Sequence, residues 1–136
     1  MSLFVVPGGA DFDVERVSSR HFRLTNASDR HVAIKVRCSN NQLYRVKPVF
    51  SALEPGQMGE LEVWRMKGPA KIDRLVIQMV ELTAPCKAED ASKHFKHGRK
   101  YTSARIVLNA GDLPQQPDAS LAPETEHATL EKEIII

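Results

Sequence analysis

Hydrophobic and polar residues alternate along most of the chain up to about residue 109, and this period of two predicts β-strands. The clearest run is 31–38, where Val32, Ile34, Val36 and Cys38 fall on one face and mostly polar residues fall on the other. Similar alternation predicts strands near 21–25, 58–66 and 101–109, whereas 73–83 is apolar on both faces and should lie centrally in a sheet. The residues predicted to face the core are Phe22, Leu24, Val32, Ile34, Val36, Leu61, Val63, Leu75, Ile77, Ile106 and Leu108.

Turn-forming residues separate these runs. They occur at 26–29, 39–41, 54–56 and 67–69, where Asn, Asp, Ser, Gly and Pro gather. One segment, 88–97, has a helical pattern, with Gly98 as a plausible stop. Six or seven short strands at spacings of about 8–12 residues, with one short helix, predict an all-β antiparallel sandwich.

Charge divides the chain into two parts. Up to Leu108 there are eighteen Lys and Arg against eleven Asp and Glu, a net charge of +7; from Asn109 onward there is one Lys against six acids, a net charge of −5. The last segment also contains three prolines and few large apolar residues before the terminal isoleucines. We therefore expect one domain over 1–109 and a flexible acidic tail over 110–136. The tail could fold back on the basic domain, engage a partner or keep the protein soluble, and the sequence favours the last.

No pattern of residues indicates catalysis or a cofactor. Cys38 and Cys86 are expected to be reduced thiols, and His94 and His97 lack the further ligands that a zinc site needs. We found no secretory signal, and no apolar stretch approaches the ~20 residues that span a bilayer, so we expect a cytoplasmic protein without membrane insertion. The basic cluster around Lys93 lacks a nucleic-acid-binding motif, so it is interpreted as a solvated surface.

Five segments together resemble the major sperm protein domain. Residues 24–37 resemble a strand ending in Asn, a polar turn, and a strand that reads apolar-Lys-apolar-Lys. Residues 44–48 and 53–56 resemble the family's Val-x-Pro and Pro-Gly elements, 73–78 its sixth strand, and 91–96 a short helix with a Phe. The resemblance covers about residues 3–109 and implies a seven-stranded immunoglobulin-like sandwich, in agreement with the periodicity.

The resemblance implies two candidate functions, both non-enzymatic. In the first, the chain is a structural or accessory component of a nematode sperm cytoskeleton, located in the pseudopod, and binds filaments, other domains of this family or itself. In the second, it is a soluble adaptor similar to the family's membrane-tethered receptors, which bind short acidic peptides on a basic sheet face. The chain lacks the coiled coil and membrane helix of that branch, which favours the first function.

The receptor branch also suggests where a partner would bind. Its two strand lysines match Lys35 and Arg37, and its sixth-strand Lys and Met match Arg74 and Val76, so the Met is lost. The two Thr that follow the family's Lys strand are Cys38 and Ser39 here. Trp64, on the polar face of its predicted strand, is a further candidate anchor. The alternative is that these residues form an ordinary solvated sheet face.

Overall fold

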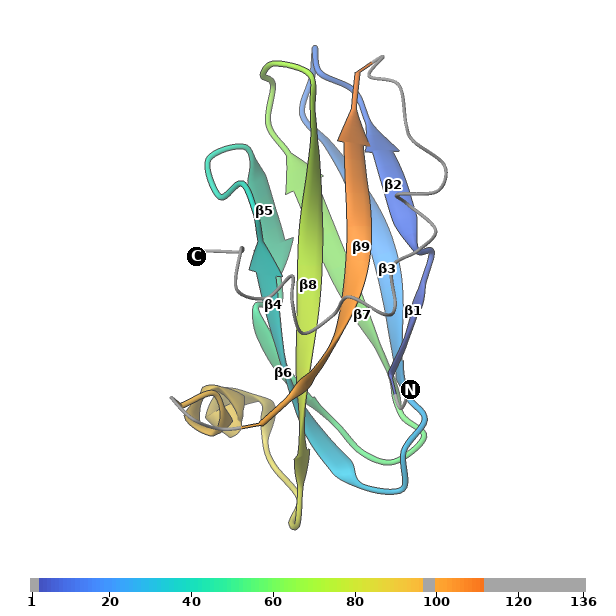
Figure 1. The fold of residues 1–136 in the computed structure, drawn as a ribbon, viewed down its shortest axis with the longest axis vertical. Coiled ribbons are helices and arrows are strands. Elements are labelled where there is room, and N and C mark those ends of the chain that lie inside the picture. The colour runs from blue at the N-terminus through green and yellow to red at the C-terminus, as the bar shows by residue number, and fades with distance from the viewer. Residues whose placement is uncertain (1–2, 97–99, 112–136) are drawn as a thin grey trace.

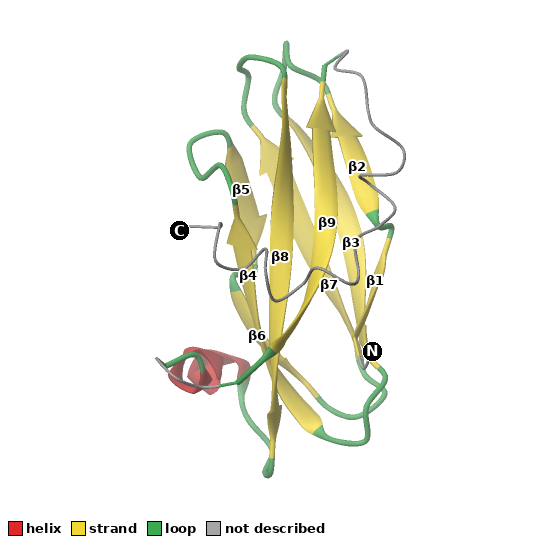
Figure 2. Cartoon of the chain, in the orientation of Figure 1, coloured by secondary structure: helices red, strands yellow, loops and turns green. Residues whose placement is uncertain are grey.

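Two β-sheets packed face to face form the molecule in the computed structural model, which describes residues 3–96 and 100–111 (Figures 1 and 2). One sheet has four strands in the order β1-β3-β7-β5, and the other has five in the order β2-β9-β8-β4-β6. A short 3-10 helix, η1, packs at one end of the five-stranded sheet. The elements are β1 Leu3–Val6, β2 Gly9–Phe12, β3 Ser18–Asn26, β4 His31–Cys38, β5 Tyr44–Lys47, β6 Phe50–Leu53, β7 Met58–Arg65, β8 Lys71–Leu82, η1 Ala88–His94 and β9 Thr102–Ala110.

The described residues form nine strands rather than seven because two strands are each broken by a proline. The chain passes from β1 in one sheet to β2 in the other at Pro7, and from β5 to β6 at Pro48, both after cis peptide bonds. Proline lacks the N–H that a sheet ladder needs, so it ends the pairing in the first sheet. If β1 with β2, and β5 with β6, are each counted as one split strand, the described strands number seven, as the family resemblance implies.

One strand pair departs from the expected antiparallel arrangement. β2 runs parallel to β9, with Gly9 opposite Val107 and Phe12 opposite Ala110, whereas the other pairs are antiparallel. The reason is the crossing at Pro7: β2 joins the second sheet in the direction that the chain already has when it leaves β1. As predicted, β8 lies centrally, between β9 and β4.

The core between the sheets contains all eleven residues predicted from the alternation, each at most 3 % exposed. Phe12, Tyr44 and Met79 join them, and the Phe12 and Tyr44 rings meet edge to face. A second, smaller cluster lies on the outer face of the five-stranded sheet, where Ala91 of η1 packs near Ala33 and Val80. The helix is therefore held by apolar contacts. It ends earlier than the expected residue 97, and Gly98 lies outside the described residues.

A fully buried arginine closes the turn after β7. The guanidinium of Arg65 donates hydrogen bonds to the carbonyl oxygens of Met66 and Gly68, at 3.3 and 3.4 Å, and to that of Pro69. It also lies 5.6 Å from the centre of the Tyr44 ring. These contacts offset the cost of removing a cation from water, because carbonyl oxygens and an aromatic face replace its hydration.

Candidate protein-binding surface

Register places the predicted cations side by side on the outer face of the five-stranded sheet. Lys35 lies opposite Gln78, Arg37 opposite Val76, and Val76 in turn opposite Arg105. Arg74 is one step further along β8, opposite Val107. We call these cations, Lys35, Arg37, Arg74 and Arg105, together with Val76, Gln78 and Ser103, the basic face.

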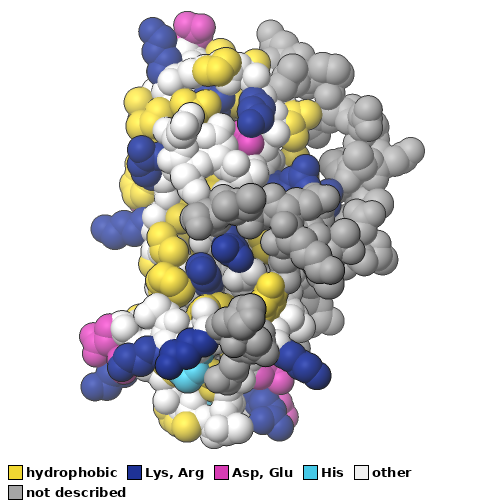
Figure 3. Space-filling view, turned by 60° about the vertical axis from the view of Figure 1, so that its left-hand side comes forward, with side chains coloured by type: hydrophobic (Ala, Val, Ile, Leu, Met, Phe, Trp, Pro, Cys, Tyr) yellow, Lys and Arg dark blue, Asp and Glu magenta, His cyan; other side chains and the backbone are white. Residues whose placement is uncertain are grey.

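The described acid on this outer face nearest to β9 is Asp11 of β2, whose carboxylate accepts a hydrogen bond from the Asn109 amide at 3.3 Å, whereas the residues around the basic face in β4, β8 and β9 are not acidic. Ten residues of β4, β8 and β9 point outward there, and none is Asp or Glu: Ala33, Lys35, Arg37, Arg74, Val76, Gln78, Val80, Ser103, Arg105 and Val107. Figure 3 shows several Lys and Arg side chains along the visible side of the molecule. Cations two residues apart on a strand project in one direction, so their fields add over this surface.

Lys35 is the cation most affected by its surroundings. Burial lowers its pKa, and the nearby positive charge of Arg37 lowers it further. Its ammonium group lies 5.6 Å from the centre of the Phe50 ring, which also contacts Phe95 beyond η1 with ring centres 6.0 Å apart. A carboxylate near Lys35 and Arg37 would relieve this repulsion, and the adjacent aromatic rings offer an apolar contact beside it.

Two buried residues with hydrogen-bond donors, Gln78 and Ser103, lie in one row with Lys35 across β8 and β9. Gln78 and Ser103 are 2 % and 4 % exposed, yet the Gln78 Nε2 and Ser103 Oγ atoms have no hydrogen-bond partner within 3–96 and 100–111. The buried Nε atom of Arg37 likewise has no hydrogen-bond partner among these described residues. Leaving a buried donor unpaired costs about 1–3 kcal/mol. A bound acceptor, such as a carboxylate or a backbone carbonyl, would remove that cost.

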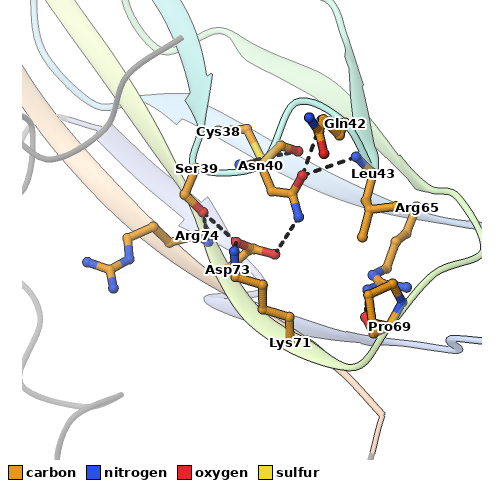
Figure 4. Close-up of polar contacts among 10 residues, drawn as sticks. All are labelled: Cys38, Ser39, Asn40, Gln42, Leu43, Arg65, Pro69, Lys71, Asp73 and Arg74. Carbon is orange, nitrogen blue, oxygen red and sulfur yellow. Dashed lines mark hydrogen bonds and ion pairs between the residues drawn. The ribbon is translucent and has the colours of Figure 1, made fainter.

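A buried polar cluster lies behind one end of the basic face (Figure 4). The Asp73 carboxylate, 3 % exposed, accepts hydrogen bonds from the Ser39 hydroxyl at 2.9 Å and from the Asn40 amide at 3.2 Å. The Lys71 ammonium lies 3.7 Å from it. Arg74 is held through its backbone, since its N–H donates to Ser39 Oγ and its carbonyl accepts from the Ser39 N–H, both at 3.0 Å. Its side chain points away from Asp73, toward the outer face.

Two sequence-predicted site residues behave differently from the rest. Val76 is on the basic face but only 1 % exposed, between Arg37 and Arg105, so it lines the surface without projecting from it. Trp64 is on the opposite sheet, where its β7 position lies between Ser19 and Arg45. The structure therefore brings Lys35, Arg37, Arg74 and Val76 together and separates Trp64 from them.

Comparison with known proteins agrees with this architecture. The model of the MSP (major sperm protein) domain matches residues 4–100, which is most of the chain. The chain belongs to the major sperm protein domain family. This family is a structural, non-catalytic one.

Relatives of this MSP domain include sperm-specific proteins of Caenorhabditis elegans. Sperm-specific class P protein 32 is 34 % identical over 106 residues, which cover 78 % of this chain and 96 % of that protein. Class P protein 31 is 41 % identical over 78 residues, or 57 % of this chain and 72 % of that protein. The solved structure of the C. elegans MSP family member WR4 superposes with a TM-score of 0.73 at 30 % identity, covering 81 % of this chain and 98 % of that one.

The structure adds residues to this MSP domain's candidate surface that the sequence did not single out. Arg105, Gln78 and Ser103 come from strands far apart in the chain, and only the pairing of β8 with β4 and β9 brings them beside Lys35 and Arg37. Among the described residues, no three His, Cys, Asp or Glu side chains form a group suited to a metal, and no helix has the length and apolarity of a membrane span. His97 lies outside the described residues.

Proposed function

We propose that this MSP domain is a non-enzymatic, protein-binding component of the major sperm protein cytoskeleton of nematode sperm, and that the basic face is its binding surface. The sperm-specific relatives support the cellular setting, which we take to be the cytoplasm of the pseudopod. The observation that carries the proposal is the gathering of Lys35, Arg37, Arg74 and Arg105 on one face of the five-stranded sheet.

The chemistry of the face indicates the kind of partner. Four cations, and the buried donors of Gln78 and Ser103 that lack a partner within 3–96 and 100–111, suit a segment rich in carboxylates and backbone carbonyls. Each exposed ion pair contributes only about 0–1 kcal/mol, so affinity requires several pairs together with an apolar contact. The half-buried rings of Phe50 and Phe95 beside Lys35 supply such a contact. We therefore expect a partner segment with several acids and one apolar or aromatic side chain.

The same face also supports a second candidate function, a soluble adaptor for short acidic peptides. Lys35, Arg37 and Arg74 occupy positions that match the cations of the family's peptide-binding receptors. Val76 is shorter than the Met of those receptors and is buried, which argues for weak capture of a receptor-type peptide. The two functions differ in the partner and share the surface.

Co-sedimentation with assembled major sperm protein filaments tests the first function, and titration with a short acidic peptide tests the second. Wild type should sediment with filaments, and added salt should release it because the Debye length falls from ~10 Å at 0.1 M to ~3 Å at 1 M. The double variant Lys35→Glu/Arg37→Glu should stay in the supernatant. A matched control, Arg23→Glu/Lys67→Glu, makes the same charge change at exposed positions away from the basic face and should sediment like wild type. Equal sedimentation of both variants would overturn the assignment of the surface.

A further inference from the structure

The acids of the C-terminal segment are segregated from the cations of the domain. Residues 112–136 contain six acids and one Lys, whereas residues 1–111 carry a net charge of +7. Four of the acids, Glu124, Glu126, Glu131 and Glu133, fall within the last thirteen residues, which end in three isoleucines. The segment thus combines carboxylates with an apolar end, the two features that the basic face requires of a ligand.

The segment follows directly on β9, a strand that carries part of the basic face. β9, which carries Ser103 and Arg105, ends at Ala110, opposite Lys71 of β8. Gly111 follows with a φ of +88°, and a Cβ there would lie 2.6 Å from the Cβ of Ala70. A glycine is therefore needed where the chain leaves the sheet. Residue 112 starts about six residues along β9 from Arg105, or roughly 20 Å at ~3.3 Å per residue.

The length of the segment suits a return to this face. A coil of 25 residues has a root-mean-square end-to-end distance of about 25–30 Å, close to the distance back to Arg105. When linker length matches the span, the effective concentration of a tethered ligand is in the millimolar range. The segment therefore has a large advantage over the tail of a second copy present at micromolar concentration.

We propose that residues 112–136 occupy the basic face of their own domain and compete there with the external partner. The carboxylates pair with the cations, and oxygen atoms of the segment accept from Gln78 Nε2 and Ser103 Oγ. This inference rests on the proposed function, because both ligands use one surface. A partner then binds only the fraction of molecules whose face is open, so its apparent affinity falls by that fraction.

The test uses a fluorescent peptide with the sequence of residues 112–136, added to the full chain and to a chain ending at Gly111. The shortened chain keeps all the described strands. Its folding alone is supported by sperm-specific class P protein 32, because the 106 residues aligned with this chain make up 96 % of that protein. The peptide should bind the shortened chain about 5- to 10-fold more tightly than the full chain, because an occupied fraction of about 80–90 % blocks the full chain. Lys35→Glu/Arg37→Glu in the shortened chain should abolish binding, whereas Arg23→Glu/Lys67→Glu should not.

A full-length variant separates charge from length. Glu124→Gln, Glu126→Gln, Glu131→Gln and Glu133→Gln together keep the segment but remove most of its acids, so the peptide should bind this variant almost as tightly as the shortened chain. Equal affinity for the full and shortened chains, or no binding to the shortened chain, would overturn the inference. Concentration-dependent oligomers of the full chain that vanish on shortening would also overturn it, since the segment would then occupy a second copy.

The two proposals fail in different ways. If the shortened and full chains bind filaments equally through Lys35 and Arg37, the proposed function stands and the self-occupancy is wrong. If the peptide of residues 112–136 binds the shortened chain but filaments do not, the self-occupancy stands and the proposed function is wrong.

Discussion

The Ser39 hydroxyl donates a hydrogen bond of 2.9 Å to the buried carboxylate of Asp73, and this contact joins the end of β4 to the start of β8. Ser39 also makes two hydrogen bonds of 3.0 Å with the backbone of Arg74: its hydroxyl oxygen accepts from the Arg74 N–H, and its own N–H donates to the Arg74 carbonyl. The position of Arg74 on the basic face therefore depends on a polar contact buried behind it. A solvated surface needs no such support, whereas a binding surface gains from cations held in a fixed register.

Replacing Asp73 with Ala should destabilise the protein by about 1–3 kcal/mol, because the Ser39 hydroxyl and the Asn40 amide would lose their acceptor in a buried site. Urea denaturation measures the free energy of unfolding. Asp29→Ala, in an exposed turn, is the matched control and should change it by no more than about 0.5 kcal/mol. Equal effects of the two substitutions would show that the Asp73 cluster contributes nothing to stability.

Truncation of Ile34 to Ala should destabilise the fold by about 2–5 kcal/mol, since its side chain is 0 % exposed between the sheets. Ile72→Ala makes the same chemical change at a side chain that is 41 % exposed, and it should cost far less. Both values come from denaturant titration. A loss below about 0.5 kcal/mol for Ile34→Ala would mean that the wrong face of β4 has been placed inward.

Stability should fall as the pH rises above about 9, because of Cys38. Burial raises the pKa of its thiol from 9.0 to about 11, so between these values the unfolded chain releases a proton that the folded chain retains. The unfolded state binds fewer protons over this window, and its relative free energy therefore drops as pH increases. Burial likewise raises the pKa of Tyr44 to about 12, so its contribution is lost at still higher pH.

The pH effect of Cys38 is measured by unfolding wild type and Cys38→Ala at about pH 8 and about pH 10.5. Wild type should lose more stability between the two conditions than the variant does. If both lose the same amount, the thiol is not protected by the fold.

Local patterns predicted the core well and the surface incompletely. Alternation alone identifies which residues of β4 and β7 face inward, since a strand has only two faces. It cannot say which sheet a strand joins, so it could not decide whether Trp64, a further candidate anchor, lies near Lys35; the two are on different sheets. Arg105 was missed because its place beside Arg37 follows from pairing across β8, a relationship between residues far apart in the chain.

Buried polar residues were the other feature that the sequence did not reveal. The alternation of β7 places Arg65 with Leu61 and Val63, but a cation at the end of a strand is usually solvated. Its burial depends on the carbonyl groups of the 66–69 turn, whose conformation the residue types alone do not fix. Asp73 is likewise buried as a hydrogen-bond acceptor only because Ser39 and Asn40, in the turn after β4, lie next to the start of β8 and donate to its carboxylate.

If partners bind the basic face, the backbone amide chemical shifts of its residues, measured by NMR, should change when a partner is added. Major sperm protein would be added to the isotope-labelled chain ending at Gly111, in which the tail cannot compete. We expect shifts concentrated at Lys35, Arg37, Val76, Gln78 and Ser103, with the amides of β3 and β7 unchanged. Shifts centred on Trp64 and its neighbours in β3 and β5, with the basic face silent, would contradict it.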